Sequence, residues 1–367
     1  MARLNVEYST ATTITVDGRE VLAFGGCNYL GLAHHPAVLG AVREGLSQYG
    51  ISTTASRETT GNTVVHDRLE EDLAAYTGQE ASILLADGYT ANIAVAQALT
   101  HTHGVALIDA KAHRSLRSAA TAAGMQVFEY EHRSGESAAW LVRQYGDQGV
   151  AIFTDGVFAA DGAVAPVAEL LKALPTHRGT LVVDDCHGLC VLGRSGAGTV
   201  DHVGIKDPRV CITTTLAKGL GCYGGAVIGR RPLVESVRER ADVYRRSTPV
   251  PTPIAMGARA AVAIVQKEPG LVEGLRRNTA AMSGVLSGLG VLQRETERRE
   301  PIPIFTFTLK NREHMERVHR GMLEAGIYAP FIEYPGGPQA MFFRLTVSAK
   351  HTQEQIARLG QELARLL

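Results

Sequence analysis

The sequence predicts an α/β protein in which a large domain with a mostly parallel central sheet is joined to a smaller C-terminal α+β domain. From about residue 80 to 230, short apolar runs alternate with polar loops and longer stretches of helical spacing, as in consecutive βαβ units. Most of these runs are apolar throughout, which is typical of strands covered on both faces. After about residue 240 the pattern changes to long helices and a few strand-like runs.

The expected strands of the large domain share this unbroken apolar character and span residues 82–85, 105–108, 150–153, 181–183, 210–212 and 226–228. The C-terminal part is expected to contain, in order, a helical stretch over about 252–290, a strand over 302–307, a helix between an N-cap at Asn311 and a C-cap at Gly326, a strand over 342–347 and a final helix from about His351. We therefore predict an N-terminal segment (1–35), a large domain (36–240) and a small domain with its connecting helix (241–367).

Composition excludes several classes of protein. The 367 residues are 45% hydrophobic and 20% charged, which indicates a folded globular chain. Lys plus Arg and Asp plus Glu both total 37 and no basic run stands out, so nucleic acid is not an expected partner. The N-terminus lacks the apolar stretch of a signal peptide, and no apolar window is long enough to span a membrane. We expect a cytoplasmic protein without a membrane partner.

The five cysteines are odd in number and widely spaced, so free thiols are expected. Cys186 and Cys190 flank His187, but no second Cys/His pair completes the four ligands of a zinc site. No metal is therefore expected.

Polar residues follow the predicted strands at the edge where open parallel sheets bind ligands. In chain order they are Asp87–Tyr89, Asp109, His113, Thr154–Gly156, Asp184–His187 and Thr213–Lys218. A lysine, several carboxylates and two imidazoles at one edge indicate a charged small-molecule ligand.

Lys218 is the candidate nucleophile, because a lysine at the edge of a sheet near carboxylates can attack a carbonyl group. Taken alone, it also fits a surface lysine beside the glycine-rich turn 219–225. Residues 219–224 match G-x-G-x-x-G, but a strand-like run follows rather than a helix, which argues against a dinucleotide site. The turn at 87–92 opens a helix whose first N–H groups suit a phosphate.

Asp184 follows a buried strand and needs a positive partner or a helix to cap. A protonated pyridine nitrogen is one such partner, and carboxylates hold pyridoxal phosphate (PLP) in this way. The capping interpretation explains Asp184 but leaves Lys218 and the phosphate-binding turn unrelated.

From about residue 22 to 350 the sequence resembles the α-oxoamine synthases, a family of fold-type I PLP-dependent transferases. The segments that carry the resemblance are Asn28–Leu32, Ser56–Arg57 with Gly61 and His66, Asp109–His113, Thr154–Phe158, Asp161–Gly162, Asp184–Gly188, Gly193–Gly198 and Thr215–Gly219.

The resemblance implies a catalytic set around the cofactor ring. Lys218 would form the Schiff base and move the α-proton, and His113 would stack on the ring. Asp184 would bind the ring nitrogen and His187 the phenolic oxygen.

The resemblance also implies further cofactor contacts. Gly88 and Tyr89 would bind the phosphate through backbone N–H groups and Thr215 through its hydroxyl, with Asp155 nearby. Thr248 would reach the phosphate of the neighbouring subunit in a homodimer with shared active sites.

On the substrate side, Arg344 would bind the amino-acid carboxylate, and Cys27 and Asn62 are expected near the substrate. Cys27 stands where the family usually has asparagine, and Ala159 and Asp87 each replace a usual serine. These departures leave the donor open.

The implied reaction condenses an amino acid with an acyl thioester of coenzyme A or of an acyl carrier protein, releases carbon dioxide and yields an α-aminoketone. An alternative is another PLP reaction on the same fold, such as transamination, racemisation or the cleavage or joining of a Cα–Cβ bond. A non-catalytic partner subunit is a third possibility, disfavoured because Lys218, Asp184 and His187 are all present.

Overall fold

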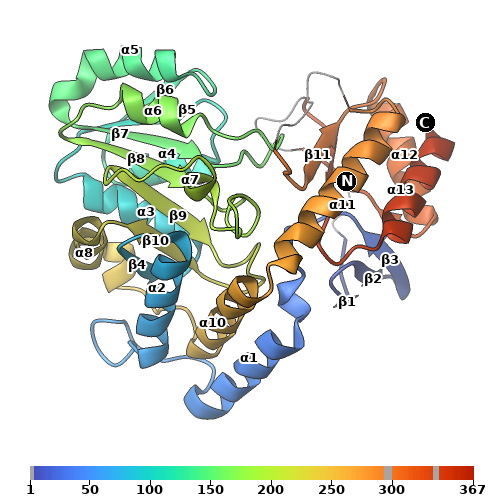
Figure 1. Ribbon diagram of the computed structural model, residues 1–367, viewed down its shortest axis with the longest axis horizontal. Coiled ribbons are helices and arrows are strands. Elements are labelled where there is room, and N and C mark those ends of the chain that lie inside the picture. The colour runs from blue at the N-terminus through green and yellow to red at the C-terminus, as the bar shows by residue number, and fades with distance from the viewer. Residues whose placement is uncertain (1–3, 293–299, 334–338) are drawn as a thin grey trace.

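The computed structural model describes residues 4–292, 300–333 and 339–367. Figure 1 shows a larger lobe built around the central sheet and a smaller lobe that contains both ends of the chain. Helix α11 (Gly270–Gly288) runs between them. The two-domain α/β architecture predicted from the sequence is therefore observed.

The large lobe is organised by a seven-stranded sheet. In spatial order its strands are β4 (Ala81–Leu85), β10 (Gly225–Gly229), β9 (Val210–Thr215), β8 (Gly179–Asp184), β7 (Val150–Asp155), β5 (Val105–Asp109) and β6 (Gln126–Tyr130). Strand β10 runs antiparallel to both of its neighbours, whereas the pairs from β9 across to β6 are parallel. The sheet is thus mostly parallel, as predicted.

Strand β6 was not predicted. It lies at the edge of the sheet beside β5, and Gln126 and Glu129 interrupt its apolar pattern. An edge strand can keep polar side chains in water, so it lacks the unbroken apolar run that marks the inner strands.

Successive side chains of the inner strands enter two separate apolar clusters, one on each face. On β8, Leu181 and Val183 belong to the first cluster and Val182 to the second. Helices α2 (Val64–Thr77), α5 (Gly135–Tyr145), α6 (Val167–Ala173) and α10 (Thr252–Lys267) contribute to the first cluster, and α3 (Gly88–Leu99), α4 (Arg114–Ala122), α8 (Arg231–Arg240) and α9 (Asp242–Arg245) to the second. The large lobe is a three-layer sandwich.

The small lobe contains two further sheets. Strands β11 (Ile304–Phe307), β14 (Phe342–Thr346) and β13 (Phe331–Ile332) form one, and β1 (Tyr8–Ser9), β2 (Thr13–Val16), β3 (Arg19–Ala23) and β12 (Ile327–Tyr328) form the other. Helices α12 (Arg312–Glu324) and α13 (Gln353–Leu366) pack beside them. Asn311 accepts a hydrogen bond from the backbone of His314 at 2.9 Å, so the predicted N-cap is observed. The C-cap is Ala325, and the predicted Gly326 follows it with φ +74°.

The predicted domain boundaries differ from the packing. Residues 1–35 were expected to form a separate segment, yet β3 pairs in parallel with β12, and Leu22 and Phe24 join the apolar cluster of the small lobe. Beyond residue 240, α10 packs against α1 (Pro36–Tyr49) and belongs to the core of the large lobe. Local sequence patterns do not encode such long-range pairings, so the predicted domain boundaries stay a prediction drawn from local pattern alone.

The helical stretch predicted over 252–290 is two helices. Helix α10 ends at Lys267 and α11 begins at Gly270, with Pro269 as its N-cap. Proline cannot donate the backbone hydrogen bond that a continuous helix needs, so the chain breaks there. In the described part of the chain, no helix combines the length and the apolar character needed to cross a membrane.

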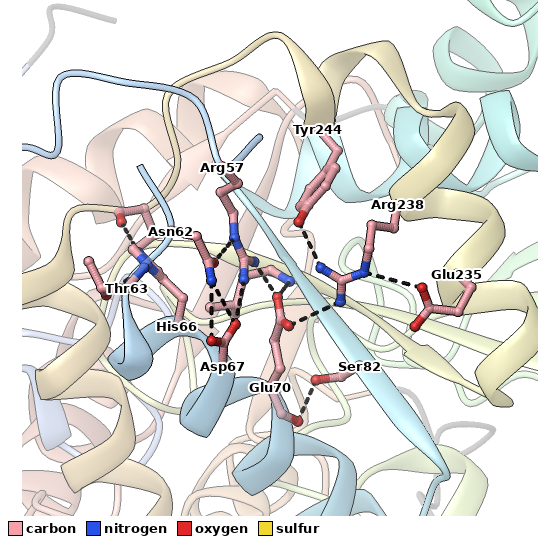
Figure 2. A network of polar contacts seen from close by, with 12 residues as sticks. Arg57, Asn62, Thr63, His66, Asp67, Glu70, Ser82, Glu235, Arg238 and Tyr244 are labelled. Atoms are coloured by element: carbon pink, nitrogen blue, oxygen red, sulfur yellow. Dashed lines mark hydrogen bonds and ion pairs between the residues drawn. The ribbon is translucent and has the colours of Figure 1, made fainter. Parts of the chain in front are cut away.

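A buried ionic network fastens α2 to the sheet and to α8 (Figure 2). The Glu70 carboxylate pairs with Arg57, accepts a hydrogen bond from the backbone of Leu84 on β4 at 2.9 Å, and lies 3.5 Å from Arg238. The Arg57 guanidinium also lies over the ring of Tyr244, 5.4 Å from its centroid. The Arg57 side chain is only 2% exposed, so its charge depends on these partners.

We predict that Glu70→Gln lowers the free energy of unfolding by about 1–3 kcal/mol, because it keeps the side-chain volume but removes the buried carboxylate beside Arg57 and leaves that charge only its pair with the half-exposed Asp67 at 3.3 Å. Urea denaturation followed by circular dichroism measures this change. Arg246→Ala is the control, since Arg246 and Asp242 form a pair whose side chains are 76% and 64% exposed, and such pairs contribute little. Equal stabilities of the two variants would contradict the prediction.

Candidate active site

A cavity of about 180 Å³ opens at the carboxyl ends of the parallel strands. Asp155 on β7, Asp184 on β8 and Thr213 on β9 are consecutive partners across the sheet, which brings the residues after these strands together. The cavity is lined by Gly88, Tyr89, His113, Ser115, Asp155, Val157, Ala159, Asp184, Cys186, His187, Thr215 and Lys218. Eight residues predicted to bind a cofactor or to act in catalysis are therefore brought together.

Asp184 is held in a fixed orientation inside the sheet. One carboxylate oxygen accepts from the backbone N–H of Cys186 at 3.1 Å, and the other accepts from the amide of Asn92 at 2.8 Å. Asn92 is completely buried on α3 and accepts in turn from the hydroxyl of Thr213 at 2.6 Å. The carboxylate is thus positioned by its neighbours before any ligand binds.

Asp155 lies beside Asp184 and receives the backbone N–H of His113 at 3.1 Å. Burial, followed by the adjacent Asp184 charge, raises the pKa of Asp155 well above its ordinary value. Two neighbouring buried carboxyl groups favour a cation bound against them.

His113 places a flat neutral ring in the cavity. It is the N-cap of α4, and its Nδ1 lies 2.7 Å from the hydroxyl of Ser115. Burial lowers the pKa of His113, with Lys218 adding to this effect and Asp184 opposing it. An uncharged imidazole can stack on a planar aromatic ligand.

Lys218 contacts a buried chain of polar groups. Its Nζ lies 2.7 Å from Nε2 of His187, and Nδ1 of His187 lies 2.6 Å from the hydroxyl of Tyr29. Burial lowers the pKa of His187 well below its ordinary value, and the Lys218 and Arg344 charges act in the same direction. His187 is therefore a neutral partner of the lysine.

The turn before α3 fits a phosphate group. Gly88 and Tyr89 begin the helix, where backbone N–H groups lack intrahelical acceptors. A Cβ added to Gly88 would lie 3.0 Å from Cβ of Thr215, so glycine keeps this approach open. Asp87 turns its carboxylate to the backbone of Thr90 at 2.7 Å, which makes it a helix cap. In this structure the Thr215 hydroxyl donates to the carbonyl of Gly224 at 3.1 Å.

Two of the residues predicted to bind substrate lie beside this cavity. Nε of Arg344 donates to the backbone carbonyl of Ala159 at 2.7 Å, and Ala159 is part of the cavity wall. Cys27 lines an adjacent hollow together with Tyr29. These two residues come from β14 and from the segment after β3.

Asn62 and Thr248 do not line the cavity. Asn62 accepts from Nε of Arg57 at 2.7 Å and donates to Asp67 at 3.0 Å, so its amide belongs to the network of Figure 2. The expectation that Asn62 contacts substrate stays a prediction, because the structure shows this exposed residue with its amide engaged by the buried Arg57. Thr248 is exposed.

Sequence reasoning assigned no role to Tyr29 or Asn92, although both belonged to segments that it singled out. Asn92 carried a detectable signal, since it is a polar residue at the start of the apolar helical stretch 93–99. Tyr29 carried none, because its contact with His187 joins residues 158 positions apart. Among the residues that the structure describes, no group of three or more His, Cys, Asp or Glu side chains is arranged to hold a metal ion.

Comparisons with known proteins agree with this architecture. Residues 19–363 match the family described as aminotransferase class I and II. An 8-amino-7-oxononanoate synthase of Thioalkalivibrio sulfidiphilus is 37% identical over 95% of this chain and 89% of that protein, and one of Nitrosococcus oceani is 33% identical over 99% and 96%. A serine palmitoyltransferase of S. paucimobilis, solved with a bound PLP–myriocin aldimine, superposes with a TM-score of 0.92 at 23% identity, over 99% of this chain and 92% of that one.

The likeness to the palmitoyltransferase confirms the predicted fold, and the synthases confirm the predicted family, whose members are PLP-dependent acyltransferases. The chain belongs to the class I and II aminotransferase family and, within it, to the α-oxoamine synthases.

Proposed function

We propose that the cavity at the edge of the central sheet holds PLP, and that the enzyme condenses an amino acid with an acyl thioester. The observation that carries the proposal is that Lys218, the oriented Asp184, the neutral His113 and the Gly88 turn surround one cavity. The products are an α-aminoketone, carbon dioxide and the free thiol of the carrier.

The residues present fit the parts of the cofactor one by one. The Asp184 carboxylate suits the protonated ring nitrogen, and the contacts from Asn92 and Cys186 keep it aimed. His113 offers a flat face to the ring. The first N–H groups of α3 suit the phosphate, at a turn where a Cβ on Gly88 would collide with Thr215. His187 offers a ring nitrogen to the phenolic oxygen.

The chain's own groups perform the proton transfer. When bound, PLP supplies an electron sink for negative charge that develops at the amino-acid Cα. Lys218 Nζ takes the α-proton, and the neutral His187 beside it adds no second positive charge. Arg344 holds the substrate carboxylate, and the Ala159 carbonyl fixes the guanidinium through Nε.

The bond changes balance without any further reactant. The electron pair of the broken Cα–H bond forms a bond to the thioester carbonyl carbon, and the carrier leaves as a thiolate. The bond from Cα to the carboxylate then breaks, carbon dioxide leaves, and a proton replaces it at Cα.

We also propose a homodimer that works in the cytoplasm. Thr248 is exposed and lies outside the cavity of its own chain, which suits a residue that serves a partner's phosphate. The five free cysteines suit a reducing compartment. Sedimentation velocity is expected to give twice the mass of one chain, and a monomer at working concentration would contradict the dimer.

Mixing the enzyme with PLP, one amino acid at a time and an acyl-CoA is expected to release free thiol and carbon dioxide in equal amounts. A thiol reagent and a carbon dioxide assay measure the two products. Alternative PLP reactions of the same fold release no thiol, so turnover of the amino acid without thiol release would overturn the proposal.

Lys218→Ala should lower the rate by at least about 10³-fold through loss of the proton-transferring amine. Lys206→Ala, at an exposed lysine, should leave it unchanged.

We predict that Asp184→Asn lowers turnover by about 10- to 100-fold while the protein still binds PLP, because a neutral amide cannot stabilise the pyridine proton. Steady-state kinetics and the visible spectrum measure the two effects.

Asp185→Asn is the matched control for this substitution. Asp185 is also buried, but its carboxylate accepts from the backbone N–H and the hydroxyl of Thr199 at 2.8 and 2.5 Å. This variant should lose thermal stability and keep the spectrum of the bound cofactor. Full activity of Asp184→Asn would exclude the ring-nitrogen role.

A further inference from the structure

Tyr29 has no part in the chemistry described above, yet its hydroxyl contacts the imidazole beside the reactive lysine. We propose that Tyr29 is a positioning residue that holds His187 as the tautomer with its proton on Nε2. This N–H is then directed at Lys218 and at the phenolic oxygen of the cofactor. The inference rests on the proposed function and extends it by one residue.

The geometry of the contact is specific. The Tyr29 hydroxyl lies 2.6 Å from Nδ1 of His187, while the two rings are 6.1 Å apart at their centroids and inclined by 58°. The residues therefore meet through the hydroxyl and not by stacking. Tyr29 is 1% exposed, and its carbonyl accepts from the backbone N–H of Ala349 at 2.8 Å, so the small lobe holds it in place.

The direction of the hydrogen bond between Tyr29 and His187 follows from which neighbouring groups can donate and which can accept. Burial raises the pKa of Tyr29 well above its ordinary value, so the phenol keeps its proton. Arg344 interacts with the same hydroxyl and can only donate. Cys27 also hydrogen-bonds to this hydroxyl, but its sulfur is a weak acceptor, so the phenol proton is directed to Nδ1 of His187 at 2.6 Å.

The remaining proton of His187 must therefore lie on Nε2. Burial, together with the Arg344 charge, keeps the imidazole neutral, with one N–H, and Nδ1 is the acceptor for Tyr29. Nε2 then directs its N–H across the 2.7 Å contact at Nζ of Lys218, an arrangement that suits the unprotonated amine. A free amine lone pair is what a lysine nucleophile needs.

No other group that acts on Tyr29 or His187 takes over the role of the Tyr29 hydroxyl proton. The charged and titratable groups that act on His187 besides Tyr29 are Lys218, Arg344 and His113, and Cys27 and Arg344 act on Tyr29. Without the phenol, nothing in this set fixes Nδ1 as the acceptor, and the imidazole can carry its proton on either nitrogen.

The test compares Tyr29→Phe with the parent enzyme in two measurements. In ¹⁵N-histidine NMR of the cofactor-free protein, His187 should change from the single Nε2–H tautomer to a mixture. In the holoenzyme, the phenolate loses a hydrogen-bond donor, so the apparent pKa of the visible cofactor band should rise by up to ~1 unit. We also expect kcat to fall by about tenfold or more, with little change in KM for the amino acid.

Tyr76→Phe is the matched control. Tyr76 is also a buried tyrosine, and its hydroxyl donates to the carbonyl of Gly196 at 2.8 Å, outside the cavity lining. This variant should leave the tautomer, the cofactor band and kcat as in the parent enzyme.

The possible outcomes separate the inference from the proposed function. A parent enzyme that binds no PLP defeats the proposed function, while the NMR measurement still reports the tautomer. If the parent enzyme binds PLP and Tyr29→Phe has the same His187 tautomer and the same pKa of the cofactor band, the inference is wrong. If the variant does not fold, the parent spectrum decides alone, because an Nδ1–H tautomer of His187 contradicts the proposal and an Nε2–H tautomer supports it.

Discussion

The pair of buried carboxyl groups at the ends of β7 and β8 is the constraint on which the site depends. Asp155 and Asp184 are neighbours across the sheet, and the continuous backbone pairing of the two strands keeps them together. Burial, and after it the Asp184 charge, raises the pKa of Asp155 well above its ordinary value, so a positive charge is favoured beside the pair. The Asn92 amide and the backbone N–H of Cys186 both donate hydrogen bonds to the Asp184 carboxylate and hold it in place. This arrangement suits the cationic ring of the proposed cofactor.

The two sides of the site have different structural origins. The central sheet supplies the groups that fit the cofactor, and these follow consecutive strands. Tyr29 and Arg344, on the substrate side, come from opposite ends of the chain and meet because β3 pairs with β12 and because Thr346 of β14 donates from its backbone to Phe24. The small lobe therefore reaches His187 through Tyr29 and the cavity wall through Arg344. A shift of this lobe would change substrate binding and the lysine environment together.

The inner strands, the helix caps and the residues around the cofactor could be predicted from the sequence, because each depends on local pattern or on position after a strand. Lys218, Asp184 and His113 are such cases. The edge strand β6, the pairing of the N-terminal segment with β12 and the contact between Tyr29 and His187 could not, since polar side chains or long separations hide them. The hydrogen bonds of Asn62 to Arg57 and Asp67 could not be predicted either, because the family resemblance says nothing of how Arg57 is neutralised in this chain.

The departures at Asp87 and Ala159 acquire physical explanations once the backbone is considered. Asp87 replaces a usual serine without placing charge at the phosphate, because its carboxylate caps α3 through Thr90. Ala159 has no hydroxyl, but its main-chain carbonyl still orients Arg344, and that contact needs no side chain. Cys27 has no such substitute. Its thiol acts on Tyr29, which also interacts with Arg344. Under the proposed role of Arg344, the exchange of asparagine for cysteine therefore lies beside the substrate carboxylate. Any difference in amino-acid donor between this enzyme and its relatives therefore has its most direct structural basis at Cys27.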